Sequence, residues 1–429
     1  MALPRLRVSE NCRYLEDETG KPFFYLADTA WELFHRLDRN QALEYLHDRA
    51  GKRFTAIQAV ALAELDGLLE PTPAGHVPLH DLDPTRPNEA YFQEVDFVVE
   101  AANDLGMYVG LLPTWGDKWS RVWGKGPEVF NADNARIYGE FLGNRYRDRG
   151  VIWILGGDRH LKSPLHGDIH RAMAHGLRQG DGGAHLITFH PQGQYSSACY
   201  FHDEDWLDFN MIQTGHTRDR DNYNSVAAEF NRLPIKPVVD GEPGYENIPH
   251  AFDTAHGRLD AYQSRKFAYW SLFAGACGHT YGCNDIWQMY DEGREPVLGA
   301  NTPWHQAIHF PGSSQMQHAR RLIEDNGFWD RLPDQSLIAN HNASGADHRR
   351  SCRAPDGRFA LIYTPTGQPF EVRLHILMGR EFAASWFNPR SGEESAPETI
   401  AGEDYASHVF RPPSTGDWVL ILRRTKDLW

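Results

Sequence analysis

The feature that most constrains this sequence is a regular alternation between two kinds of segment, which runs from residue 23 to residue 325. One kind is short, apolar and rich in β-branched or aromatic residues, as buried strands are. The other kind has apolar residues at helical spacing, which predicts amphipathic helices. We expect strands at 23–29, 54–62, 108–115, 151–157, 185–191, 208–216, 237–243 and 279–287. We expect helices at 31–50, 89–105, 131–150, 167–178, 222–233, 257–278 and 313–325.

Eight such strands alternating with helices are the number found in a (β/α)8 TIM barrel, so we predict an α/β fold of that type. An open doubly wound sheet is the alternative, but no G-x-G-x-x-G motif follows the first strand. After Gly327 the pattern changes to short strands separated by turn signals such as Asp356-Gly357. We therefore predict two domains: a catalytic barrel with an N-terminal hairpin over residues 1–330, and a small all-β sandwich over residues 331–429.

The composition argues against several classes of partner. The formal net charge is −15 and no basic run of five residues occurs, so neither nucleic acid nor a membrane surface is an expected partner. No stretch reaches the roughly 18 apolar residues of a membrane-spanning helix. The first residues lack the apolar core of a secretory signal, which predicts a cytoplasmic location, or an extracytoplasmic one if the sequence was trimmed. The five cysteines include no C-x-x-C pair, so neither a disulfide framework nor a zinc site is indicated.

Polar and aromatic residues gather at the ends of the expected strands, where barrel enzymes carry their working residues. In chain order they are Asp28, Trp31, Gln58, Trp115, Asp158, His160, His190, Gln192, Gln213, His216, Glu242, Tyr245, Tyr281, Asn284 and Trp287. Aromatic faces suit the C–H surfaces of a sugar, and acids, amides and imidazoles suit its hydroxyl groups. This set predicts a neutral, polyhydroxylated ligand such as an oligosaccharide or a small glycoside.

Two of these residues are carboxylates on strands that lie across a barrel mouth from each other. Asp158 follows the fourth strand and Glu242 follows the seventh. Glycoside hydrolysis needs one protonated and one ionised carboxyl group on either side of the scissile bond. Asp158 follows an apolar strand that contains Trp153, which favours a raised pKa and the role of the acid. We expect Glu242 to stay ionised with the help of donors such as Tyr281 or His216.

Other roles remain open for the acidic residues. Asp158 follows two glycines and could simply form a turn or cap a helix. Asp28 could cap the first helix and bind no sugar. Asp240 could act in place of Glu242, because strand alternation predicts that both side chains point to the same side.

Four segments occur in an order that resembles one known family. They are GKPFFYLADTAWELFHRL (20–37), FTAIQAVAL (54–62), WILGGDRH (153–160) and VVDGEPGYE (238–246). Together with the β-rich tail that contains SWFNPRSGE (385–393), the chain resembles the bacterial apiosidase-like glycoside hydrolases, family 140. In these proteins a barrel precedes a domain described as collagen-binding.

The resemblance implies a (β/α)8 barrel plus a β-sandwich, a retaining mechanism, no cofactor and removal of a terminal apiosyl unit from a pectin side chain. By motif, it also implies that Asp158 is the acid/base and Glu242 the nucleophile. Ala27 stands where many relatives have Gly. A cytoplasmic member would trim imported oligosaccharides or small glycosides in place of cell-wall pectin. The segments 63–88 and 114–126 would then form the walls of the pocket.

Two other classes of protein are the alternatives. A metal-dependent barrel hydrolase could use histidines such as His160, His190 and His216 as ligands, although the H-x-H pair usual on barrel strands is absent. A non-catalytic carbohydrate- or collagen-binding protein would need a broad exposed platform and would have no use for two converging carboxylates. We therefore interpret the sequence as that of a retaining, exo-acting glycoside hydrolase with no metal.

Overall fold

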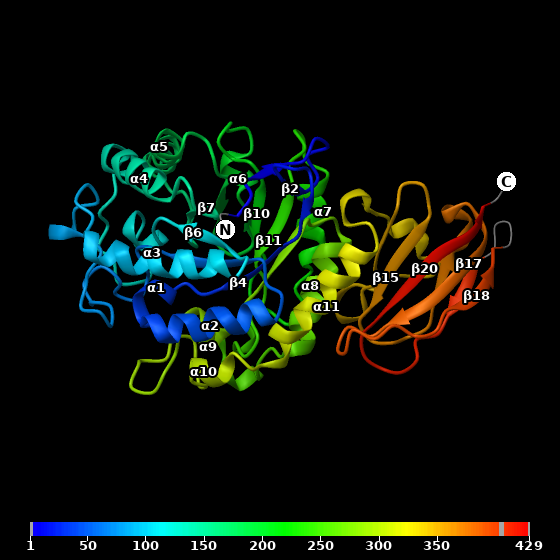
Figure 1. Ribbon diagram of the computed structural model, residues 1–429. Helices are drawn as coiled ribbons and strands as arrows, with labels where there is room; N and C mark the ends of the chain where they lie inside the picture. Colours follow the sequence, from blue (N-terminus) through cyan, green and yellow to red (C-terminus); the bar gives the residue numbers. More distant parts are fainter. Residues whose placement is uncertain (1–2, 403–406, 428–429) are drawn as a thin grey trace.

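The computed structural model describes residues 3–402 and 407–427, and its larger part is a parallel β-barrel surrounded by helices (Figure 1). The barrel strands are β4 (Tyr25–Thr29), β5 (Ala56–Val60), β6 (Tyr108–Leu112), β7 (Val151–Gly156), β8 (Ile187–His190), β10 (Asn210–Gln213), β11 (Val238–Glu242) and β12 (Gly278–Tyr281). They pair in the order β8–β7–β6–β5–β4–β12–β11–β10, and the short β9 (Tyr195–Ser196) joins β10 in antiparallel orientation. Every residue of the eight parallel strands is buried, as expected for strands covered on both faces. The predicted barrel fold is confirmed.

The barrel closes between β8 and β10 by other means than a strand ladder. Among the described residues these two strands are not paired as neighbours in the sheet. The backbone N–H of Asp208, just before β10, donates to the carbonyl oxygen of Ile187 at 2.9 Å. Thr188 Oγ1 donates to the carbonyl oxygen of Phe209 at 2.7 Å, and Asp208 Oδ2 accepts from the N–H of Ile187 at 2.7 Å. Side chains and a loop therefore close the ring at this point, which we call the β8–β10 seam.

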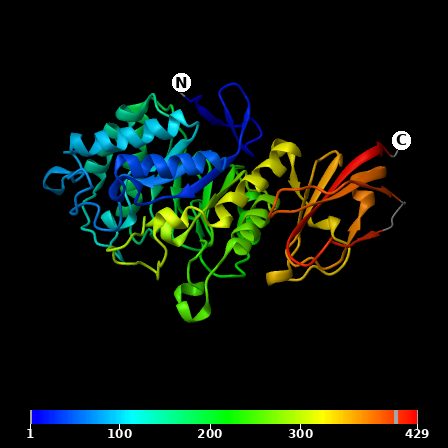
Figure 2. The same ribbon diagram turned by 60° about the horizontal axis from the view of Figure 1, so that its bottom comes forward.

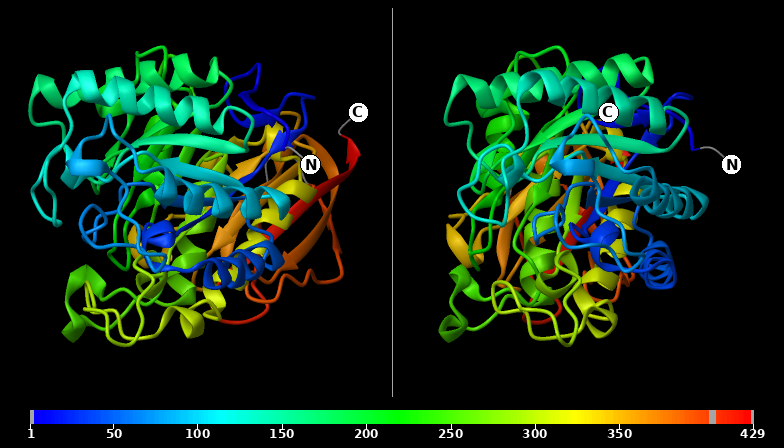
Figure 3. Two further views of the ribbon diagram at one scale, coloured as in Figure 1. Left: turned by 60° about the vertical axis from the view of Figure 1, so that its left-hand side comes forward. Right: turned by 90° about the vertical axis from the view of Figure 1, so that its left-hand side faces the viewer.

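Helices cover the outside of the barrel in all views (Figures 2 and 3). The helix expected at 31–50 is two helices, α1 (Leu33–Arg36) and α2 (Arg39–Gly51). The break occurs because Leu37 is extended and the Asp38 side chain caps α2 by accepting from Gln41 N at 2.9 Å. The others are α3 (Glu89–Asp104), α4 (Ala132–Tyr146), α5 (Pro164–Asp181), α6 (Ala198–Phe201), α7 (Asn222–Phe230), α8 (Ala261–Phe273), α9 (Asn284–Trp287), α10 (Trp304–Ala307) and α11 (Pro311–Asp325). Within the described ranges, no helix combines the length and apolarity needed to cross a membrane.

Antiparallel sheets flank the barrel in the chain. Before it, β1 (Leu6–Val8), β2 (Leu15–Asp17) and β3 (Pro22–Phe23) form a three-stranded sheet, where a hairpin was predicted. After it, a six-stranded sheet has the order β13–β14–β15–β20–β17–β18, and β16 pairs with β19 in a second sheet. Their bounds are β13 (Leu332–Pro333), β14 (Arg350–Arg353), β15 (Phe359–Thr364), β16 (Phe370–Arg373), β17 (Gly379–Phe387), β18 (Glu398–Ala401), β19 (Ser407–Phe410) and β20 (Trp418–Asp427). Buried residues of the two sheets, including Ile362, Val372 and Leu420, share one core. The all-β prediction is confirmed, while residues 1–2, 403–406 and 428–429 of the predicted domains lie outside the described residues.

The sandwich packs against helix α8 of the barrel (Figure 1). The guanidinium of Arg265 on α8 forms two hydrogen bonds with the Asp417 carboxylate, at 2.8 and 2.9 Å, and both side chains are buried. The rings of Tyr269 and Tyr363 stack with their centroids 5.0 Å apart. A buried bidentate ion pair therefore joins the two parts of the chain.

We expect Asp417→Ala to lower the free energy of unfolding by about 3–5 kcal/mol, because it leaves the Arg265 charge buried without its partner. Urea denaturation would measure the loss. The matched control is Glu94→Ala, which removes the same two-bond contact from Arg39 at the surface and should cost less than about 1 kcal/mol. Equal losses in the two variants would contradict a stabilising role for the buried pair.

Candidate active site

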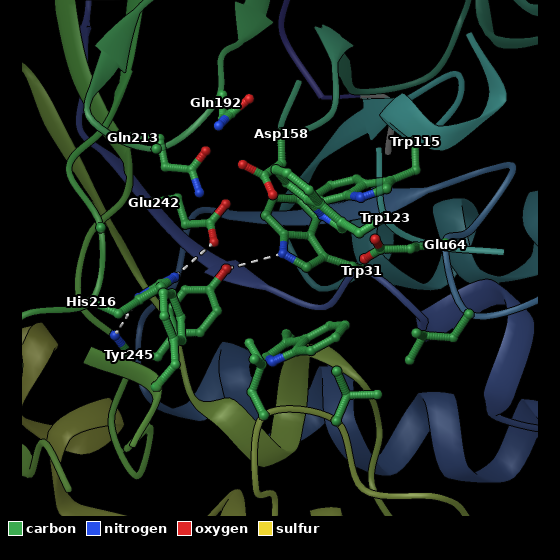
Figure 4. Close-up of a pocket in the computed structure, with 18 of the residues that line it drawn as sticks. Trp31, Glu64, Trp115, Trp123, Asp158, Gln192, Gln213, His216, Glu242 and Tyr245 are labelled. Carbon is green, nitrogen blue, oxygen red and sulfur yellow. Dashed lines mark hydrogen bonds and ion pairs between the residues drawn. The ribbon is translucent and has the colours of Figure 1, made fainter. Parts of the chain in front are cut away.

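A cavity of about 730 Å³ opens at the carboxyl ends of the barrel strands (Figure 4). Its size lies within the range of small-molecule sites, and its position is where barrel enzymes carry their active sites. Of the residues predicted from strand ends, nine line it: Trp31, Trp115, Asp158, Gln192, Gln213, His216, Glu242, Tyr245 and Trp287. The structure therefore brings most of the predicted set to one place.

Asp158 enters the cavity from an unusual turn at the end of β7. Gly156 and Gly157 have φ of 95° and 103°, and Asp158 itself has φ of 56°. A Cβ on Gly157 would lie only 2.7 Å from the backbone nitrogen of Gly116, so glycine lets these two loops approach each other. Asp tolerates a positive φ better than most residues do, and such strained positions cluster at functional sites. The turn directs the Asp158 carboxyl group toward Glu242 (Figure 4).

The surroundings of Asp158 favour its protonated form. Burial, and after it the negative charge of Glu242, raise the pKa of Asp158 to about 7. Arg159 opposes the effect, since its Nη1 lies 3.7 Å from Asp158 Oδ2. Asp158 can therefore hold a proton near neutral pH and release it to a neighbouring group.

The surroundings of Glu242 favour its ionised form. Glu242 is the last residue of β11, and burial alone would raise its pKa. Two imidazoles outweigh that effect and lower the pKa of Glu242 below its usual range: His190 Nε2 lies 2.8 Å from Oε2, and His216 Nε2 lies 3.3 Å from Oε1. The His190 contact has the distance of an ion pair without the alignment of a hydrogen bond. His216 Nδ1 accepts from the backbone N–H of Tyr245 at 3.4 Å, which orients its ring.

Asp240, the alternative to Glu242, points away from the cavity. Asp240 accepts from Asn222 Nδ2 at 3.0 Å and from Thr214 Oγ1 at 3.2 Å. The expectation that it shares the side of Glu242 is wrong, because the register of β11 against β10 skips Gly241. Such a bulge interrupts the alternation of side chains along a strand.

The remaining predicted residues do not line the cavity. Asp28 is fully buried, accepts from Tyr45 at 2.6 Å and pairs with Arg49. Gln58 donates to the carbonyl oxygen of Gly241 at 3.0 Å inside the barrel. The Tyr281 hydroxyl donates a hydrogen bond to the Glu246 carboxylate, and the Asn284 side-chain oxygen accepts one from the Trp287 indole N–H. The His160 ring is hydrogen-bonded to the Tyr200 hydroxyl. His190 is buried and contacts Glu242.

Two segments expected to form the pocket walls do contribute to the cavity. Glu64 lies in the segment 63–88 and Trp123 in the segment 114–126, although neither residue was singled out from the sequence. Burial raises the pKa of Glu64 to about 8. Glu64 follows an expected strand by two residues, so the strand-end rule could have found it. Phe252 and Leu298 lie in long irregular segments, where no periodic signal marks them.

The described residues contain no group of three or more His, Cys, Asp or Glu side chains placed to hold a metal ion.

Comparisons with known proteins agree with this geometry. Residues 9–330 match the family model described as "Apiosidase-like, catalytic domain", and residues 332–423 match one described as "Putative collagen-binding domain of a collagenase". No curated protein matches the chain at a significant level.

Solved structures are similar over nearly the whole chain. One, described as a glycoside hydrolase, is 33% identical with a TM-score of 0.89 and covers 99% of this chain and 98% of its own. A glycoside hydrolase family 5 structure from Bacteroides vulgatus is 32% identical, also with a TM-score of 0.89, and covers 99% of this chain and 95% of its own. A family 5 mannosidase from Rhizomucor miehei is only 12% identical over 75% of this chain and 98% of its own, with a TM-score of 0.54, which concerns the fold alone. Because the catalytic-domain model matches most of the chain and two similar structures cover nearly all of it, the chain is a glycoside hydrolase that belongs to the apiosidase-like family.

Proposed function

We propose that the protein is a retaining, exo-acting glycoside hydrolase in which Asp158 is the acid/base and Glu242 is the nucleophile. One observation carries the proposal: the two carboxyl groups face each other across the cavity, and their pKa values are displaced in opposite directions (Figure 4). Glycoside hydrolysis requires one carboxyl group that is protonated and one that is ionised. We assign this chemistry to the barrel of residues 1–330 and a bracing role to residues 331–429.

In the first step, Glu242 attacks the anomeric carbon and forms a glycosyl–enzyme ester. Asp158 gives its proton to the glycosidic oxygen as the bond to the leaving group breaks. In the second step, Asp158 takes a proton from water, which attacks the anomeric carbon and releases Glu242. His190 and His216 keep Glu242 ionised for the attack, and they stabilise its charge again when the ester breaks.

The shape of the cavity favours attack on a terminal sugar unit. Trp31, Trp115 and Trp287, which we call the floor, line the cavity and are only 2%, 4% and 5% exposed. Trp115 Nε1 and Gln213 Oε1 have no hydrogen-bond partner among the described residues, so both can bind sugar hydroxyl groups. We propose a neutral terminal unit such as apiose, held by these residues together with His216 and Tyr245.

The stereochemistry of hydrolysis tests the mechanism. We expect proton NMR, recorded during cleavage of an aryl glycoside from a panel that includes apiosides and arabinofuranosides, to show a first product with the anomeric configuration of the substrate. A single displacement by water would give the opposite configuration. Inversion would refute the nucleophilic role of Glu242 and leave it as a base toward water.

A further inference from the structure

Arg159, which follows the proposed acid in the chain, is a fully buried cation beside the cavity. Two carboxylates of the described residues pair with it, and neither contact is short. Its Nη2 lies 3.4 Å from Glu64 Oε1, and its Nη1 lies 3.7 Å from Asp158 Oδ2. A buried arginine is commonly held by two short bonds to one carboxylate, as Arg265 is by Asp417. The place of Arg159 between two carboxyl groups therefore needs another explanation.

The guanidinium of Arg159 connects the acid to the wall of the cavity. Its Nη1 donates to the carbonyl oxygen of Asp158 at 2.7 Å, and its Nη2 donates to that of Trp123 at 2.7 Å. Its Nε donates to the carbonyl oxygen of Ser120 at 3.2 Å. The Trp123 ring, which lines the cavity (Figure 4), also covers the guanidinium, 3.9 Å from the ring centroid. One side chain thus holds together the segment 114–126 and the turn that carries Asp158.

The same segment packs closely on the aliphatic part of Arg159. The N–H of Gly116 donates to the carbonyl oxygen of Gly157 at 3.0 Å, and a Cβ on Gly116 would lie only 2.3 Å from Arg159 Cγ. Asp158 itself has a φ of 56°, a conformation that persists only where its surroundings impose it. The hydrogen bond from Arg159 to the Asp158 carbonyl oxygen, anchored on the opposite loop, supplies part of that constraint.

The charged groups around Asp158 act on its carboxyl group in opposite directions. Burial and then the charge of Glu242 raise the pKa of Asp158. Three basic side chains oppose this increase: His190, Arg159 and His216. Arg159 alone among them stays charged at every pH at which the protein is folded, because a guanidinium does not lose its proton in proteins.

The charge of Arg159 also acts on the acids of the wall. Burial raises the pKa of Glu64 to about 8 and raises that of Asp117, and the charge of Arg159 opposes both increases. Asp117 has a cation of its own, since Lys118 Nζ lies 2.8 Å from its carboxylate. Arg159 is therefore the fixed charge that Asp158 and Glu64 share.

Resting on the proposed role of Asp158, we infer that Arg159 is a positioning residue with two separable actions: its fixed charge acts on the Asp158 carboxyl group, and its bonds to three carbonyl oxygens hold the acid and the Trp123 wall in place. The first action matters because Asp158 gives up its proton in one step and takes one back in the next, so it must not hold the proton too tightly. The first action needs only a positive charge. The second needs the planar set of donors that lysine lacks.

Two substitutions of Arg159 separate these actions. Arg159→Met removes the charge and every donor. We expect it to move the basic limb of the kcat/KM profile to higher pH by about one unit, because Asp158 then keeps its proton longer. Arg159→Lys keeps the charge and should leave the limb in place, but it should raise KM about tenfold, since the wall that contacts the substrate is loosened. The shift in Arg159→Met should persist in a Glu64→Gln background, which excludes Glu64 as its source.

Arg265→Met is the matched control, because it also removes a buried arginine but lies on α8, away from the cavity. It should lower the temperature of unfolding and leave both the limb and KM unchanged. An unmoved limb in Arg159→Met, or a wild-type KM in Arg159→Lys, would overturn the inference. If Arg159→Met does not fold, Arg159→Lys decides alone: an unmoved limb with a raised KM supports the inference, and any other combination refutes it.

A titration that does not use activity distinguishes failure of this inference from failure of the proposed function. In protein with ¹³C-labelled aspartate carboxyl groups, the Asp158 resonance is the one missing from Asp158→Asn. Its midpoint should lie near 7 in the wild type and about one unit higher in Arg159→Met. If the wild type cleaves no glycoside, the proposed function fails, and a midpoint that rises in Arg159→Met but not in Arg159→Lys still supports the action of Arg159 on Asp158. Equal midpoints in the wild type and Arg159→Met would refute it.

Discussion

Glu242→Ala is expected to lower kcat by about 10⁴-fold or more, the scale of loss seen when an enzyme loses its nucleophile. Added azide should restore turnover, because it fits the space of the missing carboxylate and attacks the anomeric carbon directly. The product should then be a glycosyl azide of the opposite anomeric configuration, since only one displacement takes place. Rates and product configuration can be measured with the aryl glycoside and proton NMR.

The matched control for this experiment is a pair of amide variants within one cavity. Glu242→Gln should be as inactive as Glu242→Ala, whereas Glu295→Gln changes an exposed carboxylate at the opening and should retain most of the activity. Near-normal turnover by Glu242→Gln would remove the residue from the mechanism. Because Asp240 points toward Asn222, its substitution should act through stability and give no azide product.

Asp158→Asn is expected to slow the hydrolysis of glycosides with poor leaving groups by about 10²- to 10⁴-fold, the contribution typical of a positioned acid. Aryl glycosides with acidic leaving groups need no proton and should lose much less. Azide should again accelerate the variant, this time by attacking the glycosyl–enzyme, so that the azide product keeps the configuration of the substrate. The opposite configurations from the two variants distinguish the two roles.

The pH dependence of kcat/KM follows from the same pair. The reaction needs Asp158 protonated, so activity should fall as the pH rises through about 7. The reaction also needs Glu242 ionised. Because the pKa of Glu242 is lowered, activity should be lost on the acidic side only at a pH below the usual pKa range of a glutamate. The basic limb should disappear in Asp158→Asn. Glu64 also has a raised pKa, to about 8, so Glu64→Gln is the necessary control and should keep the limb. A limb that persists in Asp158→Asn and vanishes in Glu64→Gln would transfer the acid role to Glu64.

The barrel could be predicted because its signal is local. An apolar segment such as 151–157 must be buried on both sides, and β7 occupies nearly the same residues. The position of Asp158 also followed from local pattern, since a residue after such a strand lies at the barrel mouth. Apolar periodicity and turn residues depend only on residues close together in the chain, so the strands and turns that they predict are also found in the folded structure.

What could not be predicted depends on pairs that are distant in sequence. Asp28 has the strand-end position of a ligand-binding residue, but Arg49, on a helix, neutralises it inside the fold. The direction of Asp240 depends on a bulge at Gly241, which shows only in the register between β10 and β11. Phe252 reaches the cavity from a segment without periodic structure. None of these relations has a signature within a short window of sequence.

The β8–β10 seam has a consequence for how the barrel opens. At the seam β8 has a ladder partner on one side only, and β10 has only the two-residue β9 on its second side, so local fluctuations that separate strands should begin there. His190 and Gln213 are the last residues of the two strands that flank it. A transient opening would therefore withdraw an imidazole from Glu242 and an amide from the sugar at the same moment. Heating should accordingly weaken catalysis before it unfolds the rest of the barrel.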